Sequence, residues 1–470
     1  MASLAIPAAR LVRSAKHIVP GQLLVTEYLF SVPKDYSNFA SGEVQLFARA
    51  ATKLETCTTI PEQHVPQRPW MVFLAGGPGF GNPEPQDAPL TRFVLKKGYQ
   101  VLFLDYRGVG LSTPVTADTI PQQPAEQFEY LKHFRQDNNV RDLEAVRNYL
   151  TAGVTDPAKR KWSIFGQSFG GFVSLSYLSK HPEGLAEVWI TGGLAPISRA
   201  PQEVYRATFK KVRERNVAYY KKFPEDVASV RRIAQYLHSH NGVQLPAGGK
   251  ATARRLLTLG HMFGFHGGID SVHAMVLRMG MDLDQYGFLT RPTLTQFETF
   301  LPLDSAPIYA ILHEAIYCYK KGIASNWAAQ SVGQELEDFR WLSTDQHGFD
   351  DSSFLKDSTP LMFSGEMIFP FMFDDYVELG KIKKAAEALA RFDEWDSLYD
   401  EEQLARNTVP VYAASYMEDM YVEYGLARET TAKVNGIKTF ETNTMYHNAI
   451  RAQSEDVLSQ LFKLRDDTID

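Results

Sequence analysis

The sequence predicts an α/β fold with a mostly parallel central sheet and helices on both faces. Strand and helix signals alternate through the first two hundred residues, and strand signals return after residue 407. Such alternation is typical of a parallel sheet, because each crossover places a helix against one face. The stretch between has helical periodicity and predicts a large inserted helical cap. We therefore expect residues 1–197 and 408–470 to form one sheet domain and residues 198–407 the cap.

The early strands are predicted from β-branched and aromatic runs. LLVTEYLFSV and VQLFARA are expected to pair, while WMVFLAGG and YQVLFLDYRG are continuous apolar runs that end in glycine-rich loops, as buried strands do. The opening MASLAIPAARLVRSAK has basic residues and no acidic ones. We expect it to be an unstructured start, with an organelle-targeting segment as the alternative.

The later helices and strands are predicted from changes in the period at which apolar residues recur. NNVRDLEAVRNYLTAG predicts a helix with Asn139 as its N-cap, because apolar residues recur at helical spacing after it. AEVWITGG predicts the next strand. The cap contains amphipathic runs such as PQEVYRATFKKVRERNVAYYKKF and IKKAAEALARF. Strands return in TVPVYAASYMEDMYV and GIKTFETNTMYHNAI, and SEDVLSQLFKLRDD predicts a final helix.

Composition restricts the class of protein. The 470 residues are 44% hydrophobic and carry a net charge of -6, so there is no basic footprint for nucleic acid. No apolar run is long enough to cross a bilayer. The two cysteines, Cys57 and Cys318, cannot form a disulfide framework, and no secretory signal precedes the first strand. We expect a cytoplasmic protein in which Cys318 is a buried small hydrophobic residue.

The stretch FGQSFGGFVSLSYL contains the pattern G-x-S-x-G between a strand signal and a helix signal. A catalytic serine at such a corner lies on a strained turn, and small residues such as Gly166 and Gly170 suit the crowded backbone. The alternative is a glycine-rich turn with a solvated serine. The flanking strand and helix favour Ser168 as a nucleophile at the carboxyl end of a strand.

A serine nucleophile needs a base, and the base needs an acid that holds its tautomer. Asp419 follows the strand VPVYAAS, and His447 follows the strand KTFETNT, so the chain order is serine, acid, histidine. His447 is the one histidine after the last strand. Glu418, beside Asp419, is the competing acid.

The oxyanion of a tetrahedral intermediate needs two backbone donors. Phe169, directly after Ser168, and the loop AGGPGFGNP are placed for this role, and Gly76 and Gly77 allow the loop backbone to approach a substrate. The alternative is a tight strand exit. The loop lacks the Lys and Ser/Thr of a phosphate-binding P-loop.

Several ordered motifs carry a family resemblance. GGPGFGNP, DYRGVGLSTP, GQSFGGFVSLSYLSKHPEGL, LHEAIYC, GEMIFPFMFDDY and MYHNAIR together resemble the proline iminopeptidases, prolyl aminopeptidases of the α/β-hydrolase superfamily, and especially their long-capped branch. The resemblance extends from about His17 to the C-terminus. It implies one catalytic set: Ser168 as nucleophile, Asp419 as acid, His447 as base, and Gly77 with Phe169 as oxyanion donors.

Two departures from the family pattern bear on substrate preference. Ala75 stands where many members have His, and Tyr106 stands where many have Gln. Neither position is a catalytic group in the implied set.

The resemblance also implies how a protonated N-terminal amine is recognised. Carboxylates in an apolar pocket bind an ammonium group by charge-assisted hydrogen bonds, and Glu314 and Glu366 match the family positions expected to carry them. The alternative for each is an acid on a helix or turn paired with Lys or Arg. HEAIY is no zinc motif, because Tyr317 stands where H-E-x-x-H requires His. We infer no metal and no cofactor.

Three functions are compatible with these residues. The first is a serine aminopeptidase that releases an N-terminal residue, preferably proline, from peptides through an acyl-enzyme. The second is a carboxylesterase or related acyl hydrolase with the same triad, and the third is a non-catalytic binding protein on a hydrolase fold. The expected partners are peptides with a free N-terminal residue, without nucleic acid or membrane, and the oligomeric state is left open. Ser168 excludes enzymes that need a carboxylate nucleophile.

Overall fold

A nine-stranded sheet forms the core of the computed structural model, which describes residues 6–54, 68–342 and 359–467. Cys57 lies outside these ranges. The strand order is β1-β2-β3-β5-β4-β6-β7-β10-β11. The strands are β1 (Arg10–Val19), β2 (Leu23–Pro33), β3 (Glu43–Lys53), β4 (Trp70–Leu74), β5 (Gln100–Leu104), β6 (Trp162–Gln167), β7 (Leu185–Thr191), β10 (Val411–Tyr416) and β11 (Ile437–Thr442).

The sheet is antiparallel at one edge and parallel elsewhere. β1 pairs with β2, β2 with β3 and β3 with β5 in antiparallel register, and the predicted pairing of LLVTEYLFSV with VQLFARA is the β2–β3 ladder. From β5 to β11 all neighbours are parallel. The predicted fold class, with a mostly parallel sheet, is confirmed.

The expectation of an unstructured start is wrong from Arg10 onward, because Arg10–Val19 forms β1. Most side chains of β1 are exposed on both faces, so the strand shows no apolar alternation that the sequence could reveal. The backbone ladder to β2 holds it at the sheet edge, and an edge strand rich in basic residues is a common protection against edge-to-edge pairing.

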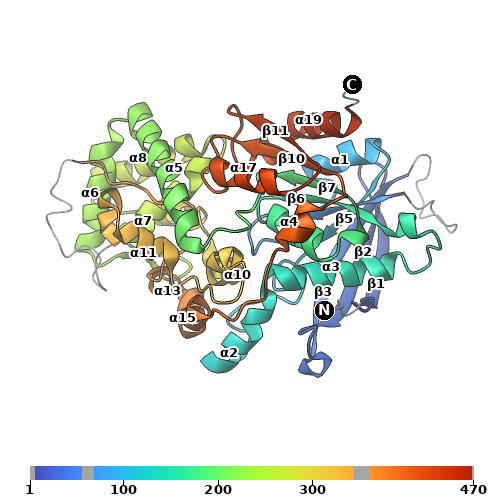
Figure 1. Ribbon diagram of the computed structural model, residues 1–470. Helices are drawn as coiled ribbons and strands as arrows, with labels where there is room; N and C mark the ends of the chain where they lie inside the picture. Colours follow the sequence, from blue (N-terminus) through green and yellow to red (C-terminus); the bar gives the residue numbers. More distant parts are fainter. Residues whose placement is uncertain (1–5, 55–67, 343–358, 468–470) are drawn as a thin grey trace.

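Helices cover both faces of the sheet (Figure 1). α1 (Pro89–Lys96) and α19 (Ser454–Asp466) pack together on one face, where the rings of Trp189 and Phe462 lie 4.4 Å apart. The other face carries the helices α3 (Gln136–Leu150), α4 (Phe169–Lys180) and α17 (Tyr424–Lys433). Shorter helices flank these layers: α2 (Pro124–Leu131) and α18 (Ala449–Ala452).

The expected N-cap of α3 is wrong. The helix begins at Gln136 with Arg135 as its N-cap, and Asn139 is a buried residue in its first turn. The polar residues before the apolar pattern are helical because tertiary contacts hold them, as when Gln136 donates to Ser176 Oγ at 2.8 Å and to the Tyr399 hydroxyl at 3.1 Å. Periodicity alone does not reveal such contacts.

Between β7 and β10 the described residues form helices and one short strand pair, β8 (Val243–Gln244) with β9 (Lys250–Ala251). This helical region lies beside the sheet (Figure 1). Its α-helices are α5 (Pro201–Lys222), α6 (Asp226–Ser239), α7 (Ala253–Leu257), α8 (Gly268–Tyr286), α9 (Arg291–Glu298), α10 (Pro307–Leu312), α11 (Ala328–Gln334), α13 (Met372–Asp375), α14 (Val377–Gly380), α15 (Lys383–Arg391) and α16 (Glu401–Ala405). The cap boundaries at 198 and 407 stay a prediction. In the described ranges, no helix has the length and apolarity needed to cross a membrane.

A buried arginine ties the helical region to the sheet domain. Arg135 donates to the backbone carbonyls of Cys318 at 2.8 Å and Asp396 at 2.7 Å, and its guanidinium lies 4.4 Å from the centre of the Trp395 ring. Its charge is paired with Asp137 at 3.0 Å. The start of α3 and the segment that returns from the cap are thus held by one side chain.

Candidate active site

Ser168 lies at the corner between β6 and α4 with φ 55° and ψ -122°, a left-handed backbone that non-glycine residues rarely adopt. Glycine is required on both sides of Ser168 because a side chain there would clash with the neighbouring backbone. A Cβ at Gly166 would lie 2.3 Å from the carbonyl oxygen of Gly170, and one at Gly170 would lie 2.0 Å from that of Leu74. The backbone around Ser168 is therefore closely packed on both sides.

Three predicted residues meet at the carboxyl ends of the parallel strands. His447, after β11, has Nε2 2.8 Å from Ser168 Oγ and Nδ1 2.7 Å from Oδ2 of Asp419, after β10. All three side chains are buried. Oδ1 of Asp419 accepts the backbone amides of Tyr421 at 2.8 Å and Val422 at 3.0 Å, so the carboxylate has a fixed orientation. The arrangement can pass a proton from the serine to a histidine whose other nitrogen faces a carboxylate.

The charge of Asp419 decides the basicity of His447. Burial alone would lower the pKa of His447, but the nearby charge and hydrogen bond of Asp419 outweigh burial and raise it above its ordinary value. Glu418, the competing acid, points elsewhere: its carboxylate is partly exposed and lies 3.6 Å from Lys211 Nζ. The structure brings Asp419, and not Glu418, to the histidine.

The two predicted oxyanion segments adjoin Ser168. Phe169 is the first residue of α4, so its amide lies at a helix N-terminus, where the backbone favours negative charge. Gly77 lies in the loop after β4 with φ 130°, and a Cβ on its neighbour Gly76 would come 3.0 Å from Ser168 Cβ. Both segments have backbone near the serine.

The two departures from the family pattern contact each other beside this loop. The Tyr106 hydroxyl donates to the carbonyl oxygen of Ala75 at 3.4 Å, and the Tyr106 ring packs edge-on against Phe169, with ring centres 5.8 Å apart. Tyr106 is buried and supports the loop after β4 and the start of α4. Tyr106 and Ala75 thus pack behind the two segments that adjoin Ser168.

The cap holds the loop that carries the histidine. The backbone amide of His447 donates to the Gly264 carbonyl at 3.2 Å, and that of His266 donates to Oδ1 of Asn448 at 2.9 Å. Gly264 ends the 3-10 helix η5 (Thr258–Gly264) of the cap. The Tyr421 ring lies 4.5 Å from the His447 ring. The position of His447 therefore depends on both parts of the molecule.

Glu366 lies in a largely buried polar cluster near the histidine. The Tyr309 hydroxyl donates to Oε1 of Glu366 at 2.6 Å, and His313 Nε2 lies 3.6 Å from Oε2. Burial opposes ionisation of Glu366, but His313 and the charges of His447 and His261 outweigh it, so the pKa falls to about 2. Glu366 is a carboxylate throughout the working pH range and can pair with a cation.

Glu314 has a different environment. It begins the 3-10 helix η7 (Glu314–Tyr317), and its two carboxylate oxygens accept the backbone amides of Ala328 at 3.1 Å and Ala329 at 2.9 Å, at the start of α11. Burial raises its pKa to about 7, against these hydrogen bonds, which favour the ionised form. The nearby Cys318 is buried as expected, and burial raises the pKa of its thiol to about 12.

Sequence reasoning missed three residues of the cluster around Glu366: Tyr309, His313 and His261. Tyr309 and His313 are four residues apart on the turn before Glu314, and that helical spacing next to LHEAIYC was the available signal. Burial lowers the pKa of His261 to about 4, so this histidine is neutral near pH 7. No local pattern indicated His261.

Two other clusters among the described residues have the composition of a metal site. In the first, formed by Glu144, His181 and Glu183, both oxygens of Glu144 already accept from Arg147 at 2.7 Å. The second comprises Glu225, Asp226 and His273, where Asp226 accepts from His273 at 2.9 Å and from the Tyr219 hydroxyl. The buried carboxylate of each cluster, Glu144 or Asp226, is thus already engaged within the protein.

Comparisons with known proteins show which fold and which relatives this chain resembles. A family model described as alpha/beta hydrolase fold matches residues 69–253. The chain is 42% identical over 468 residues to "Proline iminopeptidase aneH" of Aspergillus aculeatus, which covers 99% of both chains. It is 38% identical over 457 residues to a proline iminopeptidase of Aeromonas sobria, with 97% of this chain and 99% of the relative covered. A solved proline iminopeptidase of Mycobacterium smegmatis aligns over 93% of this chain and 97% of its own, with a TM-score of 0.40 and 12% identity, a likeness too distant to carry an argument.

Proposed function

This chain belongs to the proline iminopeptidase family of α/β hydrolases, and from that premise we propose that it is a serine aminopeptidase. It releases an N-terminal residue, preferably proline, from peptides. The observation that carries the proposal is the chain of contacts from Ser168 through His447 to Asp419. The cytoplasmic location and the peptide partners belong to the same proposal.

In the acylation step, His447 Nε2 takes the proton of Ser168 Oγ while Oγ attacks the carbonyl carbon of the N-terminal residue. Asp419 holds the Nδ1–H tautomer and stabilises the imidazolium that forms. The backbone amides of Gly77 and Phe169 donate to the oxyanion. His447 then gives its proton to the leaving amine, the C–N bond breaks, and the N-terminal residue remains as an ester on Ser168.

In the deacylation step, His447 takes a proton from water, and the hydroxide attacks the ester carbonyl. The tetrahedral intermediate collapses, Ser168 Oγ leaves with the proton from His447, and the free amino acid departs. The same base and the same two amide donors serve both steps, because both pass through an oxyanion at one position.

The substrate ammonium pairs with Glu366 and Glu314. Glu366 supports this role because it keeps its charge and its interactions include the charge of His447. Glu314 accepts two backbone amides and interacts with the Ser325 hydroxyl, and a bound ammonium group would favour its ionised form. A charged amine bound by carboxylates in an apolar pocket selects substrates with a free N-terminus.

Two chromogenic substrates test this function against the carboxylesterase alternative. The proposal predicts that a prolyl arylamide is hydrolysed with a much higher kcat/KM than a short-chain nitrophenyl ester normalised for its intrinsic reactivity. A strong preference for the ester would contradict it and favour an acyl hydrolase. Failure of a fluorophosphonate to label Ser168 would favour the non-catalytic binding protein.

A further inference from the structure

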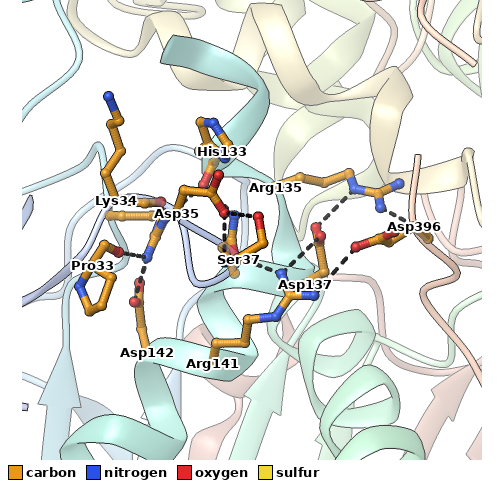
Figure 2. A network of polar contacts seen from close by, with 12 residues as sticks. Pro33, Lys34, Asp35, Ser37, His133, Arg135, Asp137, Arg141, Asp142 and Asp396 are labelled. Carbon is orange, nitrogen blue, oxygen red and sulfur yellow. Dashed lines mark hydrogen bonds and ion pairs between the residues drawn. The ribbon is translucent and has the colours of Figure 1, made fainter. Parts of the chain in front are cut away.

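Glu366 keeps its charge in surroundings unlike those of an acid of α3. Oδ1 of Asp137 lies 3.0 Å from Nε of Arg135, and Oδ2 lies 3.5 Å from Nη1 of Arg141 (Figure 2). In the described part of the chain, no lysine or arginine comes within ion-pair distance of the Glu366 carboxylate, and its charged neighbour is His313. A buried carboxylate needs such a partner, because burial alone favours the neutral acid.

His313 is fixed against Glu366 from several sides. Its side chain is buried, and its Nε2 lies 3.6 Å from Oε2 of Glu366, while the other carboxylate oxygen accepts from Tyr309. Among the described residues this Nε2 has no hydrogen-bond partner. The His313 ring packs between two tyrosine rings, with ring centres 5.0 Å from Tyr309 and 6.3 Å from Tyr317. A buried ring nitrogen thus faces one carboxylate, in a ring that has little freedom to turn.

Tyr205 of α5 indicates which ring nitrogen of His313 carries the hydrogen. The Tyr205 hydroxyl lies 3.4 Å from Nδ1 and has no other hydrogen-bond partner within the described ranges. Burial raises the pKa of Tyr205 well above its ordinary value, so the hydroxyl keeps its proton and can donate to Nδ1. A neutral imidazole that accepts at Nδ1 carries its hydrogen on Nε2, and an imidazolium has that hydrogen as well. In both charge states Nε2–H faces Glu366.

The distance between His313 and Glu366 fits a donor to the carboxylate better than a second acceptor for the substrate ammonium. Two acceptors on one tetrahedral nitrogen lie about 4.6 Å apart when each hydrogen bond is about 2.8 Å long. Nε2 of His313 and Oε2 of Glu366 are only 3.6 Å apart. His313 therefore suits the role of holding the carboxylate, whose remaining acceptor positions are open to the ammonium group.

We propose that His313 is a positioning residue for ammonium recognition: its Nε2–H orients the Glu366 carboxylate and keeps it ionised. Tyr205 holds the ring in the tautomer that this role requires. His313 also acts on Glu314, because its charge partly opposes the raised pKa of that acid. The inference rests on the proposed aminopeptidase function, in which these two carboxylates bind the amine of the substrate.

Substitutions of His313 test the proposal in the full chain. His313→Phe and His313→Leu both remove the ring nitrogens, so the test stays decisive if one of them does not fold. In a folded variant, kcat/KM for a prolyl arylamide should fall by about 10-fold or more, mainly through a higher KM, since Glu366 loses a donor. Hydrolysis of a short-chain nitrophenyl ester should change by less than about threefold.

His313→Gln and a distant histidine serve as controls. The amide of His313→Gln can still direct an N–H at Glu366, so it should recover most of the loss seen with His313→Phe. His240→Phe, at an exposed histidine of the cap, should behave as the parent does on both substrates.

The pH profile separates this role from one in packing. Without His313 the pKa of Glu366 should rise, because burial is opposed by fewer groups. The other titratable groups that act on Glu366 are His261, His447, Tyr205, Tyr309, Tyr317 and Tyr421. The ratio of kcat/KM for the arylamide to that for the ester cancels the titration of His447, which serves both substrates. From pH 8 to pH 5 this ratio should fall further in His313→Phe than in the parent, in which Glu314 titrates as well.

The outcomes distinguish the inference from the function on which it rests. A parent protein that does not hydrolyse the prolyl arylamide would show that the proposed function is wrong, and the inference with it. If the parent is active, any of three results would overturn the inference alone: parent-like kinetics in a folded His313→Phe or His313→Leu, equal losses on both substrates without recovery in His313→Gln, or a ratio with the same pH dependence as in the parent.

Discussion

The triad and the cap carboxylates are positioned by different kinds of structure. Ser168, Asp419 and His447 follow the parallel strands β6, β10 and β11, and hydrogen bonds of 2.7 and 2.8 Å join their side chains. Glu314 and Glu366 lie in a 3-10 turn and an irregular segment, held by contacts within the helical region. The triad thus rests mainly on sheet loops, with one contact from Gly264 of the cap to His447, while the carboxylates proposed for recognition rest on cap packing alone. A change at Glu314 or Glu366 is therefore expected to alter substrate recognition more than the reacting groups.

The two cap carboxylates also differ from each other. Glu366 receives one hydroxyl and faces histidines, and its pKa is about 2, whereas Glu314 faces two backbone amides with a pKa of about 7. Burial opposes the charge in both, but at Glu314 the amide hydrogen bonds do not overcome it. We therefore expect Glu366 to contribute more to ammonium binding.

The largest expected effect is that of Ser168→Ala. Removal of the nucleophile should lower kcat by about 10⁴-fold or more on both the prolyl arylamide and a neutral ester, and His447→Ala should do the same. The fold should persist, as checked by an unchanged far-UV circular dichroism spectrum and melting temperature. Activity near that of the parent in Ser168→Ala would show that the triad is not the reacting set.

The next effect is that of Asp419→Asn, which should reduce kcat by about 10³- to 10⁴-fold because His447 loses the acceptor that fixes its tautomer. Since Asp419 raises the pKa of His447, the residual activity should also extend to lower pH than in the parent. Glu418→Gln is the matched control and should retain activity within about twofold. A pH–rate profile of the three proteins tests both points; a severe loss in Glu418→Gln instead would mean that the acid is misassigned.

Glu366→Gln separates recognition from chemistry. The change keeps the shape but removes a charge from a largely buried site, so kcat/KM for the prolyl arylamide should fall by about 100-fold or more, roughly 3 kcal/mol. Hydrolysis of a small neutral ester should change by less than about threefold, because the triad is untouched. Equal losses on both substrates would indicate a structural role for Glu366.

The smallest expected effect is on stability, at Glu314. Its folded pKa of about 7 exceeds its ordinary value of 4.5, so between these values the folded state holds a proton that the unfolded state releases. The free energy of unfolding of the parent should therefore fall as pH rises through this window, by about 2–3 kcal/mol from this group. Glu314→Gln lacks that term. Urea unfolding of both proteins at pH 5 and pH 8 should show that the free energy of unfolding of the parent falls relative to that of Glu314→Gln as the pH rises. A difference in free energy that does not change with pH would contradict the raised pKa of Glu314.

A feature could be predicted from the sequence where it leaves a local pattern, and could not where it depends on contacts between distant residues. The buried strands, the corner at Ser168 and the order of Ser168, Asp419 and His447 could be predicted, because each depends on local period or on strand ends that must share one edge. β1 could not, since most of its side chains are exposed and only its backbone pairing holds it. Tyr309 reaches Glu366 through cap packing, and His261 acts on Glu366 through its charge; no local pattern encodes which distant residue each of them faces.

Hydrolysis of a prolyl arylamide and of its N-acetyl derivative by the unmodified protein tests the central claim most directly: that a charged amine must be bound before Ser168 is acylated. Acetylation removes the charge and leaves the scissile bond in place. We predict that kcat/KM falls by about 10³-fold or more on acetylation, while fluorophosphonate still labels Ser168 at an unchanged rate. Comparable hydrolysis of the two arylamides would contradict the account.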